Sequence, residues 1–193
     1  MGGILTERCR CNRIGESLGC LKICRRGVRS MKKGIIVAVC ISAKPNIPKY
    51  PQECVEMGEY GLVGDIHAGA MRISYLTKQL AANDRQISIV AQEDLDLLNA
   101  ELGIALKPGD LGENFTTQRL GSFSGITPGM TLQTGTVILE VTKQNDPCQN
   151  INVYHNQLVK VSYRTRTRGI LAVVKYGAGW QIHPNDMIAL YDH

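Results

Sequence analysis

The sequence is poor in aromatic residues and has no hydrophobic run long enough to cross a membrane. Among 193 residues there are one Trp and two Phe, so a core must be built mainly from Ile, Leu and Val. The longest apolar run covers residues 34–41, about eight residues where a spanning helix needs roughly 20. We therefore expect no membrane segment. A chain of this length favours one domain with one core.

Motifs for nucleotides and catalytic zinc are also missing. No Gly-Lys-Ser or Gly-Lys-Thr phosphate loop occurs, and the spaced glycines Gly58, Gly61 and Gly64 do not match G-x-G-x-x-G. The four histidines form no H-E-x-x-H motif, which argues against a catalytic zinc centre. Strands and helices do not alternate regularly, so a doubly wound nucleotide-binding fold is not expected.

Positive charge is concentrated in the first 30 residues. They hold seven of the 22 basic and two of the 17 acidic side chains, which leaves 15 of each sign in the rest. A neutral body gives no support to nucleic-acid binding. Beyond the leader, only Cys40, Cys54 and Cys148 remain, an odd and scattered set unlike a secreted disulfide framework. We expect a cytoplasmic protein.

The leader, residues 1–30, shows no helical or strand period, and three interpretations stay open. Translation naturally starts at Met31 and the leader is an upstream extension, or the leader is a disordered basic tail or targeting segment. Alternatively, four of its thiolates hold a structural zinc ion, namely Cys9, Cys11, Cys20 and Cys24. We divide the chain into this basic, cysteine-containing leader and one domain, residues 31–193.

The body is predicted to be rich in strands with one clear helix. Residues 34–42 and 85–90 are β-branched, apolar runs typical of buried strands. Residues 91–103 have helical spacing, with acidic residues in the first turn and Gly103 suited to the C-terminal cap. Further strands are expected at residues 130–135, 136–142, 157–163, 169–177 and 186–193. This pattern predicts a mainly β barrel or sandwich with a few helices.

Cys148 lies in the polar sequence NDPCQN, directly after the predicted strand at 136–142. Structural cysteines usually sit within apolar patterns, where they pack like small hydrophobic residues. Pro147 stiffens the backbone before this thiol and its neighbours are polar. From this stretch alone, Cys148 is either a presented, reactive thiol or an ordinary loop residue.

Four further polar clusters lie at the ends of predicted strands. Asp65 and His67 are two residues apart in GDIHAG, so in extended backbone they share a face and the carboxylate can orient the imidazole. Arg85 stands just before an apolar strand, where a solvated residue is the simpler explanation. Asn114 follows two turn-forming glycines. Arg168 ends an alternating basic run that suits anion binding, or a charged edge strand.

Taken in order, these motifs are similar to those of the MOSC domain family, named after the C-terminal domain of molybdenum cofactor sulfurase. The matching stretches are GLVGDIHAG, RQISIVAQEDLDLL, KPGDLGENFTT, PGMTLQTGTVILEVT, DPCQNI, RGILAVVKYG and HPNDMIAL. They cover about residues 34–191. The resemblance implies a single-domain MOSC-type β-barrel that binds the molybdenum cofactor, molybdopterin.

The resemblance also implies roles for particular residues. The family's shared cysteine, thought to carry sulfur or to ligate molybdenum, matches Cys148. Cofactor contacts are implied for Asp65, His67, Arg85, Asn114 and Arg168. Similar small members often have an Arg shortly before the Pro-Cys pair, where this chain has Gln-Asn-Asp. Lys143 is the nearest candidate to replace that Arg.

Two functions follow from the resemblance. The first is a molybdenum-dependent reductase of N-hydroxylated compounds, supplied with electrons by donor proteins because the body has no flavin, haem or iron–sulfur motif. The second is a non-catalytic carrier that holds cofactor or sulfur for a recipient molybdoenzyme. No pyridoxal-phosphate domain is present, so the chain is not expected to desulfurate cysteine itself. The sequence does not decide between these functions or give the oligomeric state. A metal-free thiol protein is a third alternative.

Overall fold

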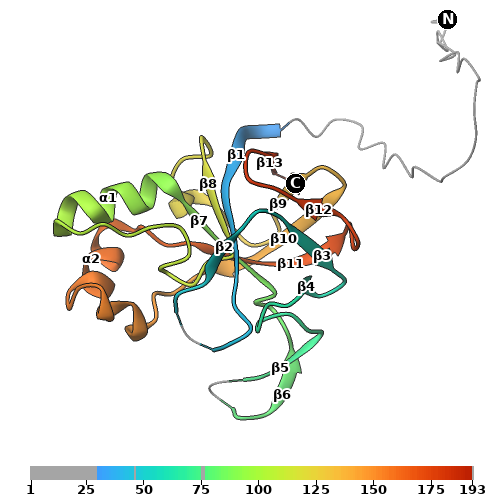
Figure 1. Ribbon diagram of the computed structural model, residues 1–193, viewed down its shortest axis with the longest axis horizontal. Coiled ribbons are helices and arrows are strands. Elements are labelled where there is room, and N and C mark those ends of the chain that lie inside the picture. Colours follow the sequence, from blue (N-terminus) through green and yellow to red (C-terminus); the bar gives the residue numbers. More distant parts are fainter. Residues whose placement is uncertain (1–29, 46, 75–76, 193) are drawn as a thin grey trace, which may run out of the picture.

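Figure 1 shows the computed structural model of the protein, which describes residues 30–45, 47–74 and 77–192. The four leader cysteines of the zinc interpretation lie outside these residues. The elements, in chain order, are β1 Ser30–Ile41, β2 Tyr50–Gln52, β3 Val55–Gly58, β4 Gly61–Leu62, β5 Met71–Ile73, β6 Leu80–Ala82, β7 Ile87–Ala91, α1 Gln92–Leu102, β8 Phe115–Gln118, η1 Phe123–Gly125, β9 Thr131–Thr134, β10 Val137–Gln144, η2 Gln149–Val153, α2 Leu158–Thr165, β11 Ile170–Tyr176, β12 Gln181–Ile182 and β13 Met187–Tyr191.

Seven strands close into a barrel in the order β13-β9-β10-β11-β7-β8-β1, and β13 pairs back to β1. Neighbouring strands are antiparallel, except for β7 and β8, which run parallel and are connected through α1. β2 extends the sheet from β1. Closure pairs the strand edges that would otherwise be open to other chains. The prediction of a mainly β barrel is confirmed.

Strand β7 is apolar throughout because both of its faces are covered. All five of its residues are buried. Ile87 and Ile89 belong to the barrel core together with both phenylalanines, Phe115 and Phe123, while Val90 packs into a second cluster beneath the helices. A strand covered on two sides needs an unbroken apolar sequence, which explains why the sequence predicted a buried strand here.

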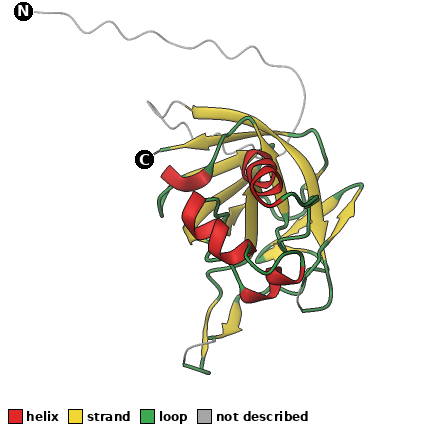
Figure 2. Ribbon diagram, turned by 90° about the vertical axis from the view of Figure 1, so that its left-hand side faces the viewer, coloured by secondary structure: helices red, strands yellow, loops and turns green. Residues whose placement is uncertain are grey.

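The two α-helices lie against one side of the barrel, as Figure 2 shows. Helix α1 matches the predicted helix: Leu95 and Leu98 are fully buried, and Gly103 ends it in the left-handed conformation with φ of 64°. The amide of Gly103 donates to the carbonyl of Asn99, which satisfies one of the carbonyls left free at the helix end. Neither helix of the described residues is long and apolar enough to span a membrane.

Helix α2 corrects the strand predicted at residues 157–163. Its buried residues are Leu158, Val159, Val161 and Ser162, a spacing that places them on one face of a helix. Leu158, Val159 and Val161 pack with α1 in the cluster outside the barrel. The valines gave the segment a strand-like sequence, but tertiary packing outweighs intrinsic preference in so short a stretch. The basic run 164–169 is consequently no edge strand: it spans the last turn of α2 and the loop before β11.

Strands β5 and β6 form a hairpin that projects from the barrel, at the bottom of Figure 1. The hairpin is inserted between His67 and Arg85, two of the predicted site residues. Its register pairs Met71 with Ala82 and Ile73 with Leu80. Because the hairpin leaves and rejoins the body at this point, its base holds two predicted site residues that lie far apart in sequence.

Candidate functional site

A cleft of about 340 Å³ opens where the loops after β1, β4 and β10 meet the start of β7. Three of the predicted site residues, His67, Arg85 and Cys148, line it together. The remaining lining residues are Pro45, Ile47, Ile66, Ser88, Leu111, Gly112, Asn145, Asn150, Ile151 and Leu171. The cleft is therefore a mainly apolar space with a few polar groups, as small-molecule sites are, and its volume falls within their range of about 300–1,000 Å³.

Cys148 presents its thiol to this cleft from the loop after β10. Its backbone is extended, with φ of −81° and ψ of 144°, and η2 begins at the next residue. The side chain is exposed and forms no disulfide. Cys40 differs: burial, reinforced by the nearby carboxylate of Glu113, raises the pKa of the Cys40 thiol to about 12. Among the described residues, Cys148 is the cysteine that lines the cleft.

His67 reaches the cleft from a loop anchored by Asp65. Oδ1 of Asp65 accepts the backbone N–H of His67 at 3.0 Å, and Nδ1 of the imidazole approaches the same oxygen at 3.4 Å. Burial alone would raise the pKa of Asp65, but hydrogen bonds from His67 and Lys49 outweigh it and hold this pKa below its ordinary value. Asp65 is buried, so it orients the His67 side chain from inside the protein.

Lys49 is a buried partner of Asp65 that sequence reasoning missed. It is only 2% exposed, and its Nζ lies 2.9 Å from Oδ1 of Asp65. Its backbone N–H donates to the carbonyl of Gly109 at 2.9 Å. A Cβ on Gly109 would lie 2.2 Å from the carbonyl oxygen of Lys49, and φ of +93° there favours glycine. Lys49 stands in a proline-rich stretch that gave no signal of burial.

Arg85 stands at the cleft beside a shared carboxylate, Asp84. Asp84 accepts from Nε of Arg72 at 2.8 Å and from Nζ of Lys143 at 2.6 Å, and Arg85 approaches it at 3.9 Å. Burial would raise the pKa of Asp84, but hydrogen bonds and positive charge from Lys143 and Arg72 lower this pKa. Lys143, the candidate to replace the family's Arg, is thus bound to Asp84. Among the described residues, Arg85 is the one basic side chain of the lysine or arginine type that lines the cleft.

Asn83 links His67 and Arg85 at the base of the hairpin, and it too was missed. Its Nδ2 donates to the carbonyls of His67 at 2.8 Å and Gly69 at 2.9 Å, while its Oδ1 accepts the backbone N–H of Arg85 at 3.0 Å. The residue is 6% exposed. Polar side chains that satisfy several backbone groups at once give little sequence signal, because any Asn before a strand resembles an ordinary turn residue.

Asn114 lies beneath the cleft and does not line it. Its Oδ1 accepts from the backbone N–H and the hydroxyl of Ser88, and its Nδ2 donates to the carbonyl of Cys40. The side chain is 1% exposed, so its hydrogen-bonding capacity is used inside the protein. Asn114 supports the cleft through Ser88, which does line it.

Arg168 lies beside the cleft, outside its lining. Its guanidinium contacts Asp146 at 3.2 Å and stacks 4.4 Å from the ring centroid of Tyr163. Its Nε is buried without a hydrogen-bond partner. Because Asp146 precedes Cys148 by two residues, Arg168 ties the Cys148 loop to α2.

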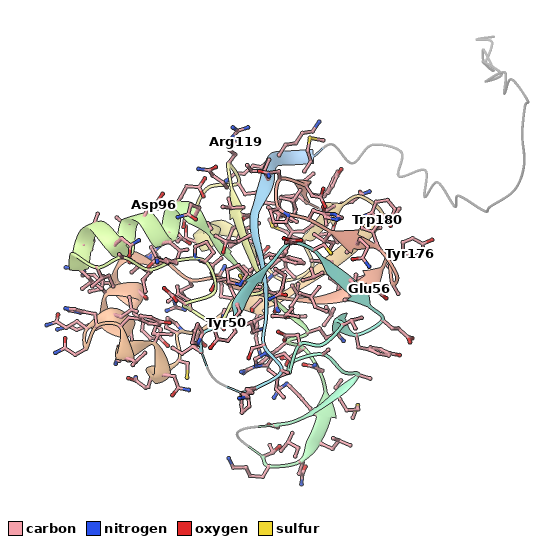
Figure 3. All side chains as sticks on the ribbon, in the orientation of Figure 1. Tyr50, Glu56, Asp96, Arg119, Tyr176 and Trp180 are labelled. Carbon is pink, nitrogen blue, oxygen red and sulfur yellow. The ribbon has the colours of Figure 1, made fainter. Side chains whose placement is uncertain are left out.

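A second hollow has a volume of about 510 Å³. It is lined by Thr134, Gly135, Gly179, Trp180, Gln181, His183, Asp186 and Met187. Trp180 lies across the molecule from Asp96 of α1 in Figure 3. This lining contains no lysine or arginine, so it offers less to an anionic ligand than the cleft does.

No group of three or more His, Cys, Asp or Glu side chains within the described residues is placed to hold a metal ion. The cleft lining offers two side chains of the kinds that commonly bind metals, Cys148 and His67. Thiolate is the form in which cysteine binds metals.

Comparisons with known proteins bear on the fold and the family of the chain. The chain resembles the YuaD protein of Bacillus subtilis, with a TM-score of 0.75, 19% identity, and coverage of 86% of this chain and 99% of that one. It also resembles YiiM of Geobacillus stearothermophilus, with a TM-score of 0.63, 20% identity, and coverage of 82% of this chain and 75% of that one. For YiiM of Escherichia coli, the TM-score is 0.60 and the identity 18%, with coverage of 83% of this chain and 70% of that one. At these identities the likeness shows the fold alone. No curated protein matches the chain. The family model of the MOSC domain matches residues 65–189, and the chain belongs to the MOSC domain family.

Proposed function

We propose that the cleft binds the molybdenum cofactor and that Cys148 provides the protein's thiolate ligand to molybdenum. The observation that carries the proposal is the exposed thiol of Cys148 in one cleft with Arg85 and His67. MOSC domains are associated with this cofactor, and the chemistry of the lining suits it. A soft thiolate is a strong donor to a metal, and a guanidinium suits phosphate or oxo groups.

Different residues of the cleft would hold different parts of the cofactor. Arg85 would pair with an anionic oxygen, and its guanidinium is half exposed toward the cleft. Ile66, Leu111 and Ile151 would cover a flat, partly apolar ring system. Asp65 and Asn114 would act indirectly, because both are buried and bonded within the protein. Arg168 would fix the loop that carries Cys148.

In the first candidate function, the loaded protein reduces N-hydroxylated compounds. One N–O bond breaks, two electrons and two protons are taken up, and an N–H group and one water form. The bound cofactor would supply the two-electron chemistry, with electrons delivered by a partner redox protein. His67 is the histidine of the cleft lining, and an imidazole can both donate and accept a proton.

The second candidate is a carrier, and the exposure of Cys148 favours it. A thiol that solvent reaches is also open to another protein, so a persulfide sulfur or the cofactor itself could pass to a recipient molybdoenzyme. This function needs no electron donor. A hydroxylamine substrate with a reduced viologen dye separates the two: turnover by the loaded protein supports the reductase, and its absence with the cofactor retained supports the carrier.

The proposal is tested by analysis of protein purified from a molybdenum-replete host. Molybdenum and pterin in near-equal amounts, approaching one per chain, are expected. Purified protein without either, when a known molybdoenzyme from the same cells is loaded, would contradict cofactor binding. The cleft would then belong to a metal-free thiol protein.

A further inference from the structure

Lys49 is an unusual residue because a lysine is almost never fully buried unless it is paired. Its ammonium contacts Asp65 at 2.9 Å, and both side chains are at most 1% exposed. The other acidic group near it is Glu113, whose pKa is raised by burial. Burial also lowers the pKa of Lys49, and the charge of Asp65 opposes that effect. Lys49 and Asp65 therefore form one charge-balanced pair.

Asp65 uses both of its oxygens to join the loop that carries His67 to the loop after β1. Oδ2 accepts the backbone N–H of Ser42 at 3.2 Å, and Oδ1 accepts from Lys49 and from the backbone N–H of His67. Nδ1 of the imidazole faces the same Oδ1 at 3.4 Å. The other ring nitrogen, Nε2, points away from Asp65, and His67 lines the cleft.

We propose that the buried Lys49–Asp65 pair is a positioning device that presents His67 to the cleft as a neutral imidazole, with its proton on Nδ1 and Nε2 free to accept one. A ring nitrogen held by a carboxylate fixes the tautomer and leaves the opposite nitrogen for the ligand. Lys49 is thus a positioning residue, and His67 is the group that meets whatever the cleft binds. The identity of that ligand rests on the proposed function, but the state of the imidazole does not.

The balancing charge explains why a lysine is placed here. An ionised carboxylate next to an imidazole favours the doubly protonated, charged ring. Lys49 offsets the charge of Asp65, so the carboxylate can orient His67 without charging it. Without Lys49, the buried carboxylate would take a proton or draw one onto His67, and in both cases the neutral ring with a proton on Nδ1 would be lost.

The test is ¹⁵N NMR of the His67 ring at neutral pH in the cofactor-free protein, which distinguishes the two neutral tautomers from the charged ring. Wild type should show the neutral form protonated on Nδ1. Lys49→Met should lose most of that form, whereas Lys44→Met, an exposed lysine in the same loop, should keep it. An unchanged His67 signal in a folded Lys49→Met protein would overturn the proposal.

A charge-balanced second variant covers the case in which Lys49→Met does not fold. Replacing both partners of a buried ion pair by apolar residues of similar volume is tolerated better than removing one, so Lys49→Met with Asp65→Leu should fold. It should show His67 mainly protonated on Nε2, because leucine offers Nδ1 no hydrogen-bond acceptor. If this folded double variant keeps the proton on Nδ1, the pair has only a structural role. Neither readout needs molybdenum, so a failure here is distinguishable from a failure of cofactor binding.

Discussion

The side chain of Asn83 donates to the backbone carbonyl of His67 at 2.8 Å, although the two residues are 16 positions apart. The same amide accepts the backbone N–H of Arg85. The two cleft residues on either side of the β5–β6 hairpin are therefore held together by one buried side chain.

Asn83→Ala should loosen this part of the cleft. It leaves the carbonyls of His67 and Gly69 and the N–H of Arg85 without their partner, and unpaired buried polar groups cost about 1–3 kcal/mol each, less where water enters. We expect a loss of about 2 kcal/mol in the free energy of unfolding, measured by urea titration. Faster hydrogen exchange at the Arg85 amide should accompany it. Asn156→Ala, at an exposed position before α2, is the control, and an equal effect of both substitutions would contradict this role of Asn83.

Arg85→Ala should weaken cofactor binding. A hydrogen bond to a charged group contributes about 1.5–3 kcal/mol, and the lower end applies because the Arg85 side chain is 47% exposed. We expect about a tenfold loss of affinity, measured as cofactor retained during dialysis. Arg164→Ala is the matched control, since Arg164 pairs with Glu101 on α1 at 2.5 Å, away from the cleft lining. Equal losses in both variants would mean that these arginines act only through general surface charge.

The sequence predicted well those elements whose local residue pattern depends directly on their burial or backbone conformation. β7 is apolar because it is covered on both faces, and α1 ends at Gly103 because the left-handed cap favours glycine. The strand prediction for residues 157–163 was wrong because the valines favour a strand locally, whereas contacts with α1 stabilise a helix. Such contacts between distant segments are not visible in a local pattern.

The candidate site could be predicted in part for the same reason. Cys148, His67 and Arg85 stood out as polar residues at strand ends, and the barrel brings them to one cleft. Lys49 and Asn83 are buried supports whose partners lie far away in sequence, so nothing near them signals their role. Asn114 and Arg168 stood out in the same way, but in this fold their polar atoms contact neighbouring loops and strands and do not line the cleft.

Asp94 should make the protein less stable as the pH rises. Burial raises its pKa to about 6, although hydrogen bonds from Ser122 and Phe123 oppose this. The folded protein therefore holds this proton more tightly than the unfolded chain, and the contribution is full below about pH 4 and is lost as the pH rises through 6. A shift of about two units corresponds to at most about 3 kcal/mol.

Asp94→Asn should remove this dependence. Measured by urea unfolding at several pH values, the stability of Asp94→Asn relative to wild type should increase between pH 4 and 7. Asp96→Asn provides the control, because Asp96 is exposed on the same helix (Figure 3). Parallel pH profiles for wild type and Asp94→Asn would show that Asp94 does not carry the effect.

The central claim is that Cys148 holds molybdenum, and the molybdenum content of Cys148→Ser tests it most directly. The side chain is exposed, so the substitution should leave the melting temperature unchanged. Cys54→Ser is the matched control, because Cys54 is also an exposed free thiol but does not line the cleft. With all three proteins purified from a molybdenum-replete host, wild type and Cys54→Ser should retain molybdenum and Cys148→Ser should lose it. Equal molybdenum in Cys148→Ser and wild type would contradict the ligand role of Cys148.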